Sequence, residues 1–171
     1  MRERMDRSVS CAFTGHRPGA LPWGTDERDS RCVELKARLA ALLRQAYHEG
    51  SRHFICGMAR GADFYFCEGV IALRRDFPDI VLEAAVPFAA QSRRWNREDQ
   101  ARYRELLAQC DLETLIQQLH SPNCMYRRNR YMVDHASRLI AVYNGQPGAS
   151  GTLNTIQYAM RQGLQVDILE V

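Results

Sequence analysis

The feature that most constrains this fold is an alternation of short apolar runs with longer segments of helical periodicity. The short runs recur at 8–13, 53–56, 80–86, 112–116, 138–143 and 166–169. Helical patterns fill the segments 26–48, 63–77, 91–109, 122–135 and 151–163 between them. Such alternation is typical of βαβ units with parallel strands. The sequence predicts an α/β fold: a Rossmann-like open, mostly parallel sheet with helices on both faces.

Length and composition place this pattern in one domain. The chain has 171 residues, of which 46% are apolar and 25% charged, an ordinary globular balance. Residues 1–7 are expected to form a disordered basic tail, and residues 8–171 a single domain. No apolar run approaches the roughly 18 residues that cross a bilayer, and the charged start lacks the apolar segment of a signal peptide. We expect a cytoplasmic protein without membrane contact.

The six cysteines indicate reduced thiols rather than a metal site. They are Cys11, Cys32, Cys56, Cys67, Cys110 and Cys124. No two have the C-x-x-C spacing that is common among zinc ligands. Most lie in apolar surroundings, as buried thiols of a reducing compartment do. We therefore predict no metal, and no cofactor beyond a bound nucleotide or nucleotide-derived ligand.

Three turns that follow predicted strands carry the best candidates for binding. They are Thr14–Pro18, Gly57–Asp63 and Gly145–Thr152. The carboxyl ends of parallel strands share one edge of the sheet, where open α/β proteins bind their ligands. Glycines permit close backbone approach, and the amides that start the following helices attract anions. A phosphate-bearing nucleotide is therefore expected at this edge.

Roles can be assigned within these turns. The amides of Gly61–Asp63 and Ser150–Thr152 are expected to hold phosphate, with Arg17 and Arg128 neutralising its charge. Asp63 is also a candidate N-cap of the following helix. His16 is either a proton donor or a structural hydrogen-bond partner of a neighbouring loop. Replacing Gly61 with valine is expected to abolish nucleotide binding and leave the fold intact.

Together the motifs resemble the YpsA-like branch of the SMF/DprA–LOG (SLOG) superfamily over nearly the full chain. They are Phe13-Thr-Gly-His-Arg-Pro18, the Gly57–Asp63 loop, Pro87-Phe88 followed by Gln91, Trp95 and Tyr103, then Arg128-Asn129 and Gly151-Thr152. The resemblance implies a Rossmann-like domain that binds nucleotides or nucleotide-derived ligands, and homo-oligomers are common among such proteins. The Gly57–Asp63 loop also looks like that of DprA, a single-strand DNA-binding recombination mediator.

The LOG branch implies an enzymatic alternative. Its members are phosphoribohydrolases that release a base from a nucleoside monophosphate, and their signature pairs an arginine with a P-G-G-x-G-T-x-x-E loop. Arg128 matches the arginine and is the weak catalytic candidate. The loop matches at Pro147, Gly148, Gly151 and Thr152. Ala149 replaces the second glycine, and Thr155 stands where the glutamate stabilises the cationic sugar, a charge that threonine cannot supply.

Three functions follow from these observations. The favoured one is a nucleotide-binding or sensing domain without strong turnover, which fits the missing glutamate. The second is a hydrolase of a nucleotide N-glycosidic bond, with Asp63 and Asp134 as candidate acids. The third is single-stranded nucleic-acid binding, which the many arginines favour, while a net charge of +3 neither demands nor excludes it. Whether the chain is an enzyme stays open at this point.

The predicted site gathers residues from every turn named above. The predicted nucleotide- or phosphate-binding residues are Thr14, Gly15, His16, Arg17, Gly57, Arg60, Gly61, Ala62, Asp63, Arg128, Asn129, Gly148, Ser150, Gly151 and Thr152.

Overall fold

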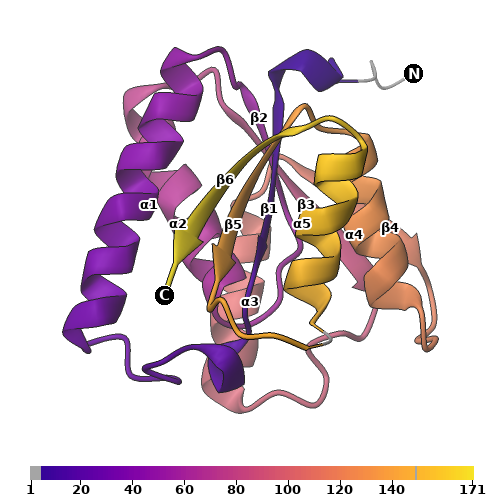
Figure 1. Ribbon diagram of the computed structural model, residues 1–171. Helices are drawn as coiled ribbons and strands as arrows, with labels where there is room; N and C mark the ends of the chain where they lie inside the picture. Colours follow the sequence, from indigo (N-terminus) through magenta and orange to yellow (C-terminus); the bar gives the residue numbers. More distant parts are fainter. Residues whose placement is uncertain (1–4, 149) are drawn as a thin grey trace.

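The computed structural model describes residues 5–148 and 150–171, which form six parallel strands and five α-helices (Figure 1). The strands are β1 (Ser10–Gly15), β2 (His53–Cys56), β3 (Val81–Phe88), β4 (Leu112–Gln117), β5 (Arg138–Tyr143) and β6 (Gln165–Glu170). The helices are α1 (Ser30–His48), α2 (Ala62–Asp76), α3 (Arg97–Ala108), α4 (Cys124–Asp134) and α5 (Gly151–Arg161), with short 3-10 helices at Arg7–Val9 and Pro18–Ala20. The predicted Rossmann-like α/β fold is confirmed.

The strand order fixes where a ligand can bind. Neighbouring strands run β4-β3-β2-β1-β5-β6, and every pair is parallel. The chain builds outward from β1 to β4 and then crosses to the other side of β1 to place β5. The order therefore reverses between β1 and β5, and the carboxyl ends of these two strands form the expected binding crevice.

Two apolar cores lie on the two faces of the sheet. Successive side chains of a strand point to opposite faces, so Phe13 and Ile140 join the core under α1 and α2, whereas Ala12 and Ala141 join the core under α4 and α5. Figure 1 shows the two helix layers on either side of the sheet. Because the central strands are packed on both faces, the two cores together position the turns at the carboxyl edge.

Two helices begin four or more residues later than predicted. The helix expected from residue 26 starts at Ser30, because the Asp29 side chain accepts a hydrogen bond from the Arg31 amide. The helix expected from residue 91 starts at Arg97, where Asn96 accepts from the Asp99 amide at 2.8 Å. In each case a polar side chain caps the helix at a later position. The segments before them are turns that lie near the sheet edge.

The predicted N-terminal tail is described only from residue 5. Residues 1–4 lie outside the described part of the chain. Asp6 accepts from the Ser8 amide at 2.9 Å, and Arg7 donates to the Ala136 carbonyl at 2.7 Å. Both residues are therefore hydrogen-bonded to the folded domain.

The described residues carry neither a membrane-spanning helix nor a metal-binding cluster. None of their helices combines the length and the apolar character needed to cross a membrane. They also contain no metal-binding cluster of histidine, cysteine and acidic side chains, and their cysteines are free thiols.

Candidate functional site

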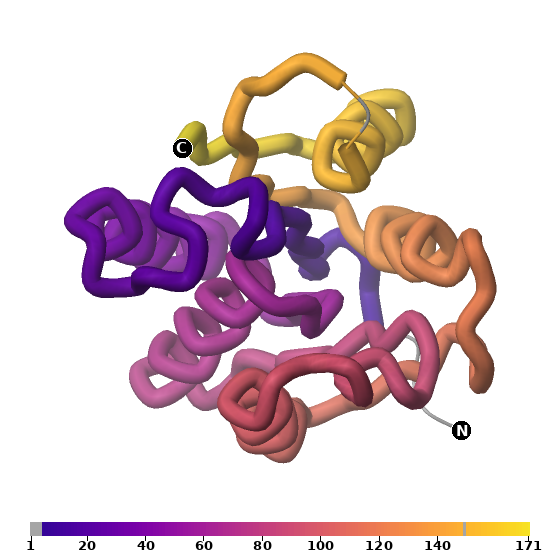
Figure 2. Tube along the Cα trace, turned by 90° about the horizontal axis from the view of Figure 1, so that it is seen from below, coloured from indigo at the N-terminus to yellow at the C-terminus, as the bar shows by residue number. Residues whose placement is uncertain are grey.

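A cavity of about 350 Å³ lies at the carboxyl edge between β1 and β5. Residues of all three predicted turns line it: Thr14–Arg17 at the end of β1 and just beyond it, Ala59 and Asp63 after β2, and Ser150–Thr152 at the start of α5. Arg128 and Asn129 of α4 complete the wall. Figure 2 looks onto this edge of the molecule, where the turns converge. The common edge expected from the sequence is therefore real.

The first two turns pack directly against each other. The Ala62 amide donates to the His16 carbonyl at 3.1 Å. A Cβ at Gly15 would lie 2.6 Å from the Cβ of Ala62, so the close approach requires glycine there. The end of β1 and the start of α2 are thereby locked together, and the Ala62 amide is engaged rather than free for phosphate.

Gly61, not Asp63, caps α2. Gly61 has φ +88°, which favours glycine, and a Cβ there would lie 2.7 Å from the His16 carbonyl oxygen. The Asp63 carboxylate instead accepts from the Ala59 amide at 2.9 Å and closes the turn from within. Valine at Gly61 would therefore disturb the packing of both turns, and the expectation that this substitution leaves the fold intact is wrong.

Arg128 is buried in the cavity wall and held by backbone. Its guanidinium donates to the Gly57 carbonyl and, at 2.8 Å, to the Asn129 side chain. A Cβ at Gly57 would lie 2.6 Å from the Arg128 Nη1 atom. Gly57 thus makes room for the arginine and accepts a hydrogen bond from it, so the second turn and α4 present one preorganised cation to the cavity.

Burial shifts the pKa values of two charged residues in the cavity wall, Asp63 and Arg128. Desolvation raises the pKa of Asp63, against the lowering influence of the Arg128 charge and of the Ala59 amide. Desolvation likewise lowers the pKa of Arg128, against the charge of Asp63. No ion pair within the described residues joins the two side chains directly. An entering anion would relieve the cost of burying Arg128.

His16 is held as a neutral ring. Its Nε2 accepts from the Asn144 amide at 3.0 Å, so the remaining ring proton is on Nδ1. Burial lowers the pKa of this imidazole below its usual value. The interpretation of His16 as a structural partner of a neighbouring loop is confirmed, since this bond ties the first turn to the segment after β5.

The start of α5 offers the cavity free amides. The Ser150 side chain accepts from the Leu153 amide at 3.0 Å and caps the helix. No described residue accepts from the amides of Gly151 and Thr152, which line the cavity. Thr155, in the position of the LOG-type glutamate, is buried, and its hydroxyl donates to the Gly151 carbonyl at 2.8 Å. Its side chain therefore points back into the helix.

Five predicted residues do not line this cavity. Three of them contact residues of the cavity wall instead: Gly57 contacts Arg128, and Gly61 and Ala62 contact His16. Arg60 turns away to Asp99 at 3.8 Å and stacks over Trp95. Gly148 lines a neighbouring hollow beside Ser150 and Gly151, and Ala149 lies outside the described residues.

Sequence reasoning missed the apolar part of the lining. It consists of Phe13, Ala20, Ala59, Met125 and Met132. Met125, Arg128, Asn129 and Met132 follow the spacing i, i+3, i+4, i+7 of one helix face. That spacing was a usable signal, because it places the two methionines beside the predicted arginine.

Three other charged residues of α4 have their partners outside this cavity. Arg127 donates to the Gln117 side chain, and Arg130 stacks over the Tyr158 ring at 3.7 Å. Asp134 is exposed and accepts from the Tyr158 hydroxyl. Asp134 is therefore not a candidate acid at this cavity, and Asp63 is the carboxylate found among the described lining residues.

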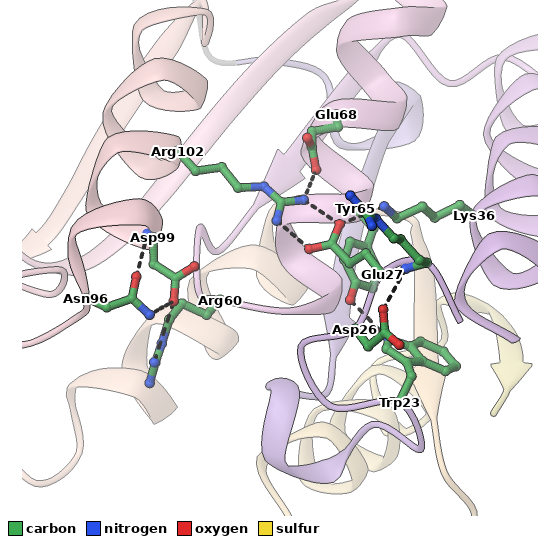
Figure 3. A network of polar contacts seen from close by, with 11 residues as sticks. Trp23, Asp26, Glu27, Lys36, Arg60, Tyr65, Glu68, Asn96, Asp99 and Arg102 are labelled. Carbon is green, nitrogen blue, oxygen red and sulfur yellow. Dashed lines mark hydrogen bonds and ion pairs between the residues drawn. The ribbon is translucent and has the colours of Figure 1, made fainter. Parts of the chain in front are cut away.

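A polar network fastens the segment between β1 and α1 (Figure 3). Glu27 pairs with Arg102 of α3 at 2.6 Å and with Lys36 of α1 at 2.7 Å. The Trp23 indole donates to the Tyr65 hydroxyl of α2 at 3.1 Å. Because this segment follows directly from Arg17, the network holds the first turn of the cavity from outside.

The amino-acid sequence matches a known family and several bacterial proteins. The model of the YspA SLOG family matches residues 11–170. The prophage-derived protein YoqJ of Bacillus subtilis is 30% identical over 75% of this chain and 82% of its own length. A UPF0398 protein of Staphylococcus epidermidis is 30% identical over 68% of this chain and 63% of its own length, and YpsA of Bacillus subtilis 25% over 81% and 78%. The chain belongs to the YspA SLOG family.

Proposed function

We propose that this chain binds a phosphate-bearing nucleotide or a nucleotide-derived ligand in the β1–β5 cavity and acts as a sensing domain without strong turnover. The observation that carries the proposal is the convergence of Arg17, Arg128 and the free amides of Gly151 and Thr152 on one cavity. Two arginines and one aspartate line the cavity, so its net positive charge favours an anion. The free cysteines fit a cytoplasmic protein.

The size and charge of the cavity support a mononucleotide-sized group. A volume of about 350 Å³ lies at the lower end of the roughly 300–1,000 Å³ of ligand pockets. Helix starts contribute only about 0.3–1 kcal/mol each at exposed sites, whereas micromolar affinity needs about 8 kcal/mol. The two arginines and the apolar methionine face must therefore supply most of the binding free energy.

Calorimetric titration with nucleoside 5′-monophosphates tests this proposal. Arg17 is exposed, and its side chain has no hydrogen bond or ion pair within the described residues, so Arg17→Ala leaves the fold unchanged and weakens binding about tenfold or more. Arg75→Ala, an exposed arginine on the far end of α2, is the matched control and binds like the wild type. Failure of every nucleotide to bind, or equal binding by Arg17→Ala, would overturn the proposal.

Hydrolysis of the N-glycosidic bond is the second candidate, because Asp63 is a carboxylate in the cavity with a raised pKa. Incubation with nucleoside monophosphates and chromatography for free base separate the two functions. A sensing domain releases no base above background. A hydrolase releases base and loses this activity in Asp63→Asn, while retaining nucleotide binding.

A further inference from the structure

A second hollow adjoins the cavity on the side of β3 and β4. It is a groove of about 640 Å³ between the turn after β3 and the segment that leads from β4 into α4. Figure 2 shows these two segments side by side at the sheet edge. Met125, in the first turn of α4, lines both the groove and the cavity. A ligand that outgrows the cavity can therefore continue over Met125 into the groove.

The groove presents cations and rings. Arg93 and Arg94 line it, are exposed, and have no side-chain hydrogen bond or ion pair within the described part of the chain. Phe88 and His120 also line it and contact each other edge to face, with ring centroids 5.1 Å apart and an interplanar angle of 79°. Unpaired guanidinium groups bind phosphate oxygens, and exposed aromatic faces stack on nucleobases.

We propose that the groove is a second compartment of the ligand site and that the ligand is a small dinucleotide. Its first phosphate lies in the cavity with Arg17 and Arg128, whereas its second phosphate and one base lie in the groove with Arg93, Arg94 and the Phe88–His120 pair. This inference rests on the proposed nucleotide function, because the cavity holds one end of the same ligand.

Titration of the whole chain with AMP and with the 5′-phosphorylated dinucleotide pApA tests the assignment. The wild type binds pApA about tenfold or more tightly than AMP, the lower end for an added charged hydrogen bond. The Arg93→Ala/Arg94→Ala variant binds pApA no better than AMP, and its AMP affinity is unchanged. The control variant Arg75→Ala/Arg104→Ala, which removes two exposed arginines elsewhere, keeps the preference for pApA.

The outcomes separate this inference from the proposed function. If AMP binds but pApA gains nothing, the groove assignment fails and the nucleotide function stands. If neither ligand binds, both fail. Equal loss of AMP and pApA in the Arg93→Ala/Arg94→Ala variant also overturns the groove as a separate compartment. Continued tightening from pApA to a ten-nucleotide oligoadenylate overturns the dinucleotide in favour of a nucleic-acid strand.

Discussion

At the scale of single residues, Gly57 is a position of the site that leaves no room for a side chain. Its Cα faces the Arg128 guanidinium, so a methyl group there would push the arginine out of its place. Gly57→Ala is expected to lower the free energy of unfolding by about 1–3 kcal/mol, as overpacking does, and to abolish nucleotide binding. Urea denaturation and calorimetry measure both effects. Gly19→Ala, where an added Cβ meets nothing within 4 Å, is the control, and equal stability of the two variants would contradict the role of Gly57.

Asp63 makes a second prediction, on pH dependence. Because its folded-state pKa is raised, the folded protein binds this proton more tightly than the unfolded chain does. Stability is therefore lost as pH rises from the unfolded pKa, about 4, through the raised folded pKa. Asp63→Asn should be more stable than wild type at pH 7 and equal to it near pH 3 in urea denaturation. Exposed Asp76→Asn shows no such gain, and a destabilised Asp63→Asn would mean that Asp63 and Arg128 stabilise each other.

The amino-acid sequence alone only partly distinguished the arginines that reach the cavity from those that do not. The sequence predicted both Arg60 and Arg128 as phosphate-binding residues, and assigned the neutralisation of the phosphate charge to Arg17 and Arg128. The structure distinguishes them through partners distant in sequence. Arg60 pairs with Asp99 and stacks over Trp95, whereas Arg128 donates a hydrogen bond to the Gly57 carbonyl. Such pairings depend on tertiary contacts that local patterns do not encode.

At the scale of elements, a buried polar chain ties four neighbouring strands together. His53 of β2 bonds to Ser10 of β1 and to Glu83 of β3, each at 2.8 Å. The other Glu83 oxygen accepts from Thr114 of β4 at 2.9 Å and from Tyr131 of α4 at 2.6 Å. Despite burial, these hydrogen bonds lower the pKa of Glu83, so the carboxylate is the form that the folded protein prefers.

Removal of that charge should weaken the sheet. Glu83→Gln is expected to lower the free energy of unfolding by roughly 1–3 kcal/mol at pH 7, because it leaves buried hydrogen-bonding groups poorly paired. In wild type this contribution is present above the unfolded pKa of about 4.3 and is lost as pH falls through the lowered folded pKa. The acid limb of a stability–pH curve is therefore flatter in Glu83→Gln. Glu113→Gln, on the exposed face of β4, serves as control, and an unaltered acid limb in Glu83→Gln would count against this role.

Elements were predictable where hydrophobic periodicity dominates and less so where caps compete. The β2 and β5 strands match their predicted bounds, because buried runs between turn residues are unambiguous. The starts of α1 and α3 moved because Asp29 and Asn96 cap later turns than the apolar pattern suggested. Several polar residues near each start could have served as caps, and only the folded surroundings select among them.

At the scale of the whole molecule, the strand order turns separate local motifs into one site. The sequence predicted that three turns share an edge, which followed from parallel strands alone. The strand order was not predicted, yet it decides which turns meet: the reversal between β1 and β5 joins residues 14–17 to residues 150–152 across the crevice. It also places the β3–β4 groove beside the cavity rather than within it.

The net charge of the molecule yields the last prediction, which separates a nucleotide ligand from a single strand of nucleic acid. A net charge of +3 is modest, and the cavity offers few cations. A strand contacting six phosphates would lose a few hundredfold in affinity between about 50 and 200 mM salt, from a slope near −0.7 per contact. A nucleotide with one or two phosphates should lose less than about tenfold in affinity over the same range of salt. Titrations of AMP, pApA and a ten-nucleotide oligoadenylate at both salt concentrations measure these slopes, and a steep slope with the oligonucleotide as the tightest ligand would replace the sensing domain with a strand-binding module.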